Sequence, residues 1–264
     1  LMIKKILIVS IIISCTQSLL GQGFSADFQK GASHFLSFSA GLAIPGGRFS
    51  NSTLYENYNN SYDINTPKLP RTGPEVFNVI GFADVGTSLS FSGAGFFSKF
   101  FGIGLRTSVS INPLSTNKLK NEYSNAFQNS SFSFDSKNSY ISALAMPGFY
   151  FQLPINDNLT ADINAGYGLQ YIKTPEIHCN YTYNNVNYKE VTYSSTNWDF
   201  SYYVSIGMKY RIDKHLGLSI DLIYNELAMD MEFITDINKT SVTNNHDLFY
   251  IVPSINIGLN YLFK

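Results

Sequence analysis

The sequence predicts an all-β protein, an eight-stranded antiparallel up-and-down transmembrane β-barrel with four long outer loops and three short periplasmic turns. The first observation behind this prediction is alternation, which is clearest at the end of the chain. From Phe249 to Lys264, every second residue is apolar and most residues between them are small or carry amides. Side chains of a strand point alternately to opposite faces, so this stretch predicts a strand with one apolar and one polar surface.

The second observation is the rhythm of the connections. Seven further alternating segments cover about residues 35–44, 79–97, 101–112, 140–153, 159–172, 198–212 and 216–224. Three short turns fall around residues 98–99, 154–158 and 213–215, and four long polar stretches cover about residues 45–78, 113–138, 173–197 and 225–247. Short turns on one side and long loops on the other are typical of barrels in the bacterial outer membrane.

The third observation is the placement of charge. Within the predicted strands, every charged residue falls on the face opposite to the large apolar side chains: Asp84, Arg106, Asp162, Asp199, Lys209, Arg211 and Asp221. A lipid-facing Arg or Lys at the bilayer centre costs roughly 2–4 kcal/mol. We therefore expect these seven residues to form a polar network inside the barrel. Eight strands enclose only enough room for side chains, which favours a packed structural plug. A conducting or substrate-lined pore is the alternative.

A soluble sandwich or lipocalin-like barrel is the competing fold. It would bury the apolar face and turn the charged face to water. The polar face of this chain is mostly Gly, Ser and Asn with few charges, which suits a crowded interior better than a solvated surface. Aromatic residues near the predicted strand ends, among them Phe96, Phe97 and Trp198, resemble the interfacial girdles of membrane barrels.

The N-terminal segment has the three parts of an export signal. Lys4 and Lys5 precede an apolar stretch from Ile6 to Ile13, and Gly21 offers a cleavage point. We therefore expect a signal peptide over residues 1–22, a periplasmic lead-in over 23–33 and a barrel domain over 34–264. Alternatively, residues 12–15 resemble a lipobox, in which Cys15 would be lipidated. The expected location is the bacterial outer membrane.

Little in the sequence points to chemistry, so we expect no catalytic residue, no metal and no cofactor. His178-Cys179 lacks a second ligand pair at metal-binding spacing. His246-Asp247 beside Asp230 or Asp236 could form a base and its orienting acid, but acids and histidines are common in solvated loops. The formal net charge of −1 gives no indication of nucleic-acid binding.

Particular segments resemble a known family. They are Ala145–Ile172, which contains Pro147-Gly148, the turn Pro154–Asn158 and Ala165-Gly166-Tyr167-Gly168, and the close Gly258–Phe263. The chain resembles the small outer-membrane β-barrel family of Bacteroidetes type, described as PorT-like or OmpA/OmpX-like. The resemblance implies that Tyr261 and Phe263 form the C-terminal signal read by the barrel-assembly machinery, although Lys264 follows Phe263 here.

These observations favour a non-enzymatic protein that acts through its extracellular loops in envelope integrity, surface adhesion or partner binding. Loop segments such as Leu54–Tyr62 and Asn180–Tyr193 are rich in Tyr and Asn, which suit adaptable contacts. Expected partners are outer-membrane lipid, the assembly machinery and a protein or surface ligand at the loops. Two alternatives stay open: an accessory component of protein secretion, implied by the PorT-like resemblance, and a lipid- or peptide-modifying enzyme.

Overall fold

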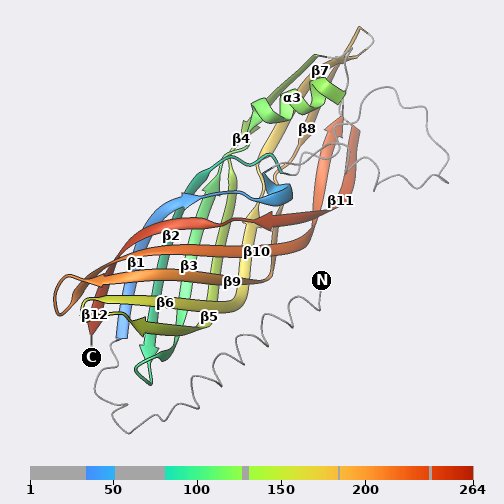
Figure 1. Cartoon of the computed structure of the whole chain (residues 1–264). Helices are drawn as coiled ribbons and strands as arrows, with labels where there is room; N and C mark the ends of the chain where they lie inside the picture. The colour runs from blue at the N-terminus through green and yellow to red at the C-terminus, as the bar shows by residue number, and fades with distance from the viewer. Residues whose placement is uncertain (1–33, 51–80, 127–130, 184, 238–239, 264) are drawn as a thin grey trace.

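Eight strands close into a ring in the computed structural model, which describes residues 34–50, 81–126, 131–183, 185–237 and 240–263 (Figure 1). All neighbouring strands of the ring are antiparallel, and β12 closes it by pairing with both β1 and β10. The predicted eight-stranded antiparallel barrel is therefore confirmed. In ring order the strands are β1 (His34–Ala43), β2 (Gly86–Phe96), β3 (Phe101–Asn112), β5 (Tyr140–Pro154), β6 (Leu159–Lys173), β9 (Thr196–Arg211), β10 (Leu216–Ile237) and β12 (Ser254–Phe263).

The outward face of this ring is an apolar belt. Where β1 meets β12, Leu36 lies opposite Tyr261 and Phe38 opposite Leu259, and all four side chains are exposed. The same pattern continues around the ring, and the outward positions of residues 216–224 in β10 are all Leu, Ile or Tyr. None of the helices in the described part of the chain has the length and apolar character needed to cross a bilayer.

Beyond one end of the ring, β10 continues into an open extension of the same sheet, which we call the outer sheet. Its order is β11 (Thr240–Ile251), the outer half of β10, β8 (Val186–Thr192), β7 (Glu176–Tyr183) and β4 (Ser131–Lys137). Figure 1 shows it on the side away from the end of β12, with helix α3 (Thr116–Ala126) beside β4. A 3₁₀ turn, η2 (Gly47–Phe49), contacts β11.

An apolar cluster, the outer core, fills the inner side of this extension. It gathers buried residues from η2, α3, the outer sheet and the outer ends of the barrel strands, including Phe49, Leu119, Tyr123, Phe132, Tyr140, Ile172, Tyr181, Met229, Met231, Phe233, Leu248 and Tyr250. Face-to-edge and tilted aromatic contacts join its parts, such as Phe49 against Tyr140 at 4.9 Å between ring centroids. The extension is thus a packed unit above the barrel.

The structure corrects the sequence prediction at three outer connections. Residues 113–138, 173–197 and 225–247 were expected to be irregular loops, and they contain α3 and β4, the β7–β8 hairpin, and the β10–β11 hairpin. In β10 the reason is that the alternation changes phase, because the inward residues above the belt are apolar. The fourth long stretch lies mostly outside the described residues, which resume at Gly81.

Two strand boundaries also differ from prediction. The strand expected to begin at Val79 begins at Gly86, because Phe82 has a positive φ of 53° and Ala83 makes only an isolated bridge to Leu114. The last strand, expected to run unbroken from Phe249, is interrupted at residues 252–253 between β11 and β12. Pro253 has no N–H to donate to a ladder, which accounts for the break.

Candidate functional site

The barrel interior contains a polar network at the level of the apolar belt. Arg106, Asp162 and Asp221 are only 2%, 2% and 4% exposed, and each projects from the inward face of its strand. The side chain of Lys209 is 13% exposed and lies 3.5 Å from Asp162. Two formal positive charges therefore face two formal negative charges inside the barrel, the balance that buried ions require.

Arg106 lies at the centre of this network. Its Nη2 donates to Asn164 Oδ1 at 3.3 Å and to Ser205 Oγ at 3.4 Å, while its guanidinium lies 5.2 Å from the centroid of the Tyr203 ring. Asn164 in turn donates to Asp162 at 3.1 Å. Three different strands, β3, β6 and β9, are joined by these contacts, so Arg106 fixes the interior from several sides.

Glycines make room for the largest interior side chains. A Cβ at Gly104 would lie 2.8 Å from Cε2 of Tyr150, and one at Gly166 would lie 2.4 Å from Cε1 of Tyr203. Neither position tolerates a side chain without displacing a ring. The inward glycines seen in the sequence are therefore packing positions, as expected for a crowded interior.

Apolar residues border the polar network on both sides. Towards the periplasmic turns, Phe35, Ala94, Phe96 and Tyr150 form a buried cluster with Leu262 packed against it, and the Lys209 ammonium lies 3.6 Å from the centroid of the Phe35 ring. Towards the outside, the outer core lies above it. Polar side chains fill the barrel between two apolar layers.

The remaining residues assigned to the interior network by sequence lie elsewhere, which corrects the prediction. Asp84 lies before β2 at the outer rim, with 42% of its side chain exposed, and pairs with Lys118 at 2.7 Å. Partial burial opposes ionisation of Asp84, but hydrogen bonds from Lys118 and Ser115 outweigh it and lower its pKa. Arg211 is exposed at the last residue of β9, and Asp199 is half-buried near the outer end of the same strand. Alternation predicted which face of the strand each residue occupies. It did not predict that all three lie near strand ends, beyond the level of the network.

The aromatic residues near the strand ends divide between lipid and interior. Phe97 is 71% and Trp198 62% exposed on the outer surface, whereas Phe96 is buried in the periplasmic cluster, contrary to its predicted place in a girdle. Tyr261 and Phe263 lie on the outward face, with ring centroids 6.2 Å apart. Lys264 lies outside the described residues. The expected signal peptide (residues 1–22, which include Cys15) and the lead-in (residues 23–33) also lie outside them.

The weak candidates for chemistry are separated by the strand geometry. His178 and Cys179 are neighbours in β7, so they point to opposite faces: Cys179 lies in the outer core and His178 at the surface. They cannot bind one ion together. The side chains of His246 and Asp247 lie outside the described residues. Among the residues that the structure describes, no three His, Cys, Asp or Glu side chains form a metal-binding group.

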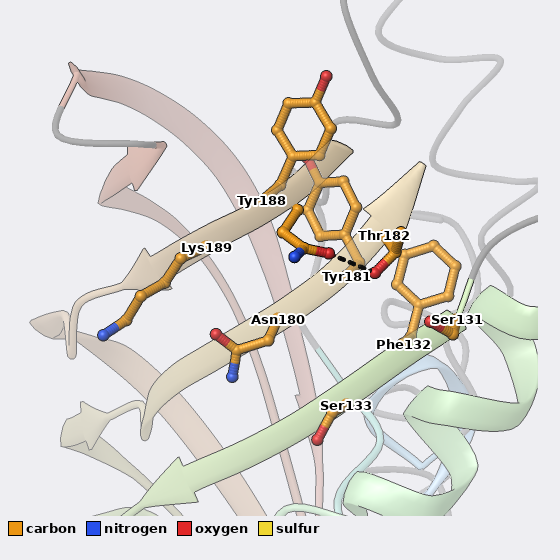
Figure 2. A pocket seen from close by; sticks show the side chains of 9 residues that line it. Ser131, Phe132, Ser133, Asn180, Tyr181, Thr182, Tyr188 and Lys189 are labelled. Carbon is orange, nitrogen blue, oxygen red and sulfur yellow. Dashed lines mark hydrogen bonds between the residues drawn. The ribbon is translucent and has the colours of Figure 1, made fainter. Parts of the chain in front are cut away.

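The outward face of the outer sheet is polar and has a trough of about 510 Å³ over β4, β7 and β8. Two polar cross-strand rows line it, Ser131 with Thr182 and Asn187, and Ser133 with Asn180 and Lys189, together with the aromatic row Phe132, Tyr181 and Tyr188. Figure 2 shows Lys189 and Asn180 pointing away from the ring of Tyr188. Residues 180–193 were expected to make adaptable contacts because they are rich in Tyr and Asn, whereas no sequence pattern indicated Ser131 or Ser133.

A charged cluster lies on the same face, nearer the membrane. Glu176 Oε1 lies 2.6 Å from His178 Nε2 and 3.1 Å from Lys137 Nζ. The hydrogen bond from His178, followed by that from Lys137, lowers the pKa of Glu176. Glu176 and Lys137 are therefore paired beside the trough, and His178 is hydrogen-bonded to the same carboxylate.

A closed ring with an apolar lipid-facing belt and a polar interior defines a β-barrel protein of the outer membrane. The chain belongs to the outer membrane protein beta-barrel domain family, whose profile matches residues 75–263. Its location is accordingly the bacterial outer membrane. The curated proteins contain no match to this sequence.

Solved structures of similar proteins share very little sequence with this chain. Neisserial surface protein A is 10% identical, with a TM-score of 0.41, covering 89% of this chain and 100% of its own. The outer membrane protein OprG from Pseudomonas aeruginosa is 11% identical, with a TM-score of 0.45, covering 89% and 97%. A major outer membrane protein from Thermus thermophilus is 11% identical, with a TM-score of 0.45, covering 88% and 100%.

Proposed function

We propose that this protein is a non-enzymatic membrane anchor that presents the outer sheet to the surroundings of the cell for binding a surface partner. The observation that carries the proposal is the outer core. Strands that leave the membrane bury Met229, Met231 and Phe233 on their inward side, and so build a folded platform. A rigid scaffold that positions a polar surface is the usual arrangement for a binding function.

The packed interior supports an anchor over a pore. Arg106 packs against the ring of Tyr203, whose hydroxyl donates to that of Tyr150 at 3.5 Å, and apolar clusters lie on both sides of this group. We expect no stable conductance from the purified protein in a planar bilayer. Regular single-channel steps at neutral pH would contradict this part of the proposal.

The surroundings of Cys179 and His178 support a non-enzymatic role. Burial raises the pKa of the Cys179 thiol, which leaves it protonated and a poor nucleophile. On the outer face, His178 is engaged by Glu176, and its cross-strand neighbours are Asp135 and Val191, neither of which is an activated hydroxyl or thiol. We expect His178→Ala to leave envelope lipids and peptide turnover unchanged.

A pair of photo-cross-linking positions tests the proposed binding function. Val186 is 50% exposed near the tip of the β7–β8 hairpin, and Ile212 is 52% exposed beside a periplasmic turn. A photoreactive residue at Val186 should capture a partner on intact cells, and one at Ile212 should not. Absence of any product from Val186 would contradict a surface-binding role.

Cross-linking at the same two positions also distinguishes surface binding from the secretion role implied by the PorT-like resemblance. An accessory component of a secretion system would be held by envelope proteins on the periplasmic side. A single stoichiometric partner captured at Ile212, with nothing captured at Val186, would favour that role over surface binding.

A further inference from the structure

We propose that the trough on the outward face of the outer sheet binds a saccharide, an inference that deepens the proposed surface-binding role and rests on it. The trough measures about 510 Å³, which lies within the usual range of roughly 300–1,000 Å³ for small-ligand sites. It faces the cell's surroundings, because the outer sheet continues from the barrel on the side opposite the short turns.

Six of the nine residues that line the trough form a grid of polar side chains from three strands. In one row Asn180 lies between Ser133 and Lys189, and in the next Thr182 lies between Ser131 and Asn187. Neighbours across strands are about 5 Å apart and rows about 7 Å apart. Every side chain of this grid carries a hydrogen-bonding group, and the aromatic residues Phe132, Tyr181 and Tyr188 complete the lining.

One internal hydrogen bond orients the grid. Thr182 Oγ1 donates to Asn187 Oδ1 at 2.8 Å, which engages the amide oxygen and leaves the amide nitrogen to donate to a ligand (Figure 2). Ser131 and Ser133 are small, so the β4 side of the trough is low while Asn187 and Lys189 border the β8 side. An amide donates and accepts through adjacent groups, which complements neighbouring hydroxyls on a sugar ring.

The same lining argues against other ligand classes. A nucleic acid requires several phosphate contacts, and Lys189 is the single basic residue in the lining. An extended peptide ordinarily pairs with the edge of a sheet, not with its face. A ligand rich in hydroxyl groups matches both the donors and the acceptors present.

Two amides provide the test. The full chain, refolded into lipid nanodiscs, is applied to an array of immobilised neutral and acidic oligosaccharides. We expect binding to at least one saccharide by the native chain, and loss of about tenfold or more in affinity for the double variant Asn180→Ala/Asn187→Ala, which removes at least two hydrogen bonds. Asn121→Ala is the matched control, since Asn121 is an exposed amide on α3 outside the trough, and its binding should equal that of the native chain.

Folding of each variant is checked by the change in electrophoretic mobility on heating. Absence of saccharide binding by the native chain, or equal binding by the double variant and the native chain, would overturn the inference. Val186 has the parity of Tyr188 and points away from the trough, so capture of a partner there tests surface binding separately: a partner at Val186 with no saccharide bound by the native chain would overturn this inference and leave the proposed function intact.

Discussion

The two halves of strand β10 bury opposite kinds of side chain. In the barrel half, Ser219 and Asp221 point inward, while Ile220 and Leu222 point outward to lipid. In the outer half, Met231 and Phe233 point inward, and the outward positions include Asp230 and Glu232. The strand is continuous, so the change follows the surrounding medium: lipid around the barrel and water around the outer sheet. Lipid excludes polar side chains and water excludes apolar ones, so polar side chains point inward in the barrel and apolar side chains point inward in the outer sheet.

The change in β10 also locates the outer boundary of the membrane. It falls between Tyr224, the last residue of the outward apolar series, and Glu226. Tyr202 and Tyr224 both donate hydrogen bonds to Glu226 Oε2, at 2.6 and 2.9 Å. Tyrosine with one apolar and one polar end is typical of the interface between lipid and water. Tyr202 and Tyr224 therefore mark the level at which the barrel half and the outer half of β10 meet.

The largest predicted effect comes from the barrel half of this comparison. Replacing Arg106 by Ala leaves Asp162 and Asp221 with one buried positive partner, Lys209, and should destabilise the protein by about 3–5 kcal/mol. Urea titration in lipid vesicles, followed by the fluorescence of the single tryptophan, Trp198, measures this loss.

Arg211→Ala is the control for Arg106→Ala, because Arg211 is exposed at the periplasmic end of β9. Its effect should lie within about 0.5 kcal/mol of zero. Equal losses in the two variants would mean that the buried network does not stabilise the barrel in the way proposed.

The second prediction uses two isoleucines on one face of β10. Ile220 is 50% and Ile234 45% exposed, but one lies in the belt and the other in the outer sheet. Ile220→Lys should cost about 2–4 kcal/mol, because it places an ammonium in lipid. Ile234→Lys should change stability by less than about 0.5 kcal/mol, because it faces water.

The fraction of protein that folds into vesicles, read from its mobility before and after heating, measures both isoleucine variants. If both lysines were tolerated, Ile220 would not face lipid. If both blocked folding, the membrane boundary would lie beyond Ile234 and the comparison between the two halves would be wrong.

The barrel half of β10 was predictable from sequence and its outer half was not, for the same physical reason. Over residues 216–224 the even positions are apolar, and the strand prediction ended where that series ended. From Leu227 to Phe233 the odd positions are apolar instead, and a test for one constant apolar face interprets the change as a loop. A search for alternation in either phase would have found the continuous strand.

Other outer elements had weaker signals. Among the side chains of helix α3 that the structure describes, Leu119 and Tyr123 are buried, which is too few for a clear helical stripe in a polar segment. The trough could not be predicted, because Ser133 and Asn180 meet only through the β4–β7 pairing, and no local feature specifies that register. Alternation predicts which way a side chain points, but not which strand lies next to it above the barrel.

The third prediction tests the outer core. Met231 is 1% exposed within it, and Met231→Ala should destabilise the outer sheet by about 2 kcal/mol through loss of apolar contact. Amide hydrogen exchange in the β10–β11 hairpin should then become roughly 30-fold faster, since opening controls exchange there.

Met208→Ala removes the same side chain from the lipid-facing surface of β9, where it is 43% exposed. Exchange in the β10–β11 hairpin should stay at its native rate in that variant. Equal acceleration in both variants would show that the outer sheet and the barrel open together, and would contradict a separate outer core.

The smallest predicted effect is a pH dependence of the outer sheet. The pKa of Glu176 is lowered from 4.5 by its hydrogen bond with His178 and then by that with Lys137, so its carboxylate contributes stability above pH 4.5 that is lost as the pH falls through its lowered pKa. Hydrogen exchange of β7 and β8 amides should therefore accelerate at acid pH, while amides of the barrel half of β10 should not. Glu176→Gln should weaken this acid dependence. The cluster lies on the water-facing side of the outer sheet, so we expect a local effect. Equal acceleration of exchange at the barrel amides would contradict it, because it would show that acid destabilises the whole molecule.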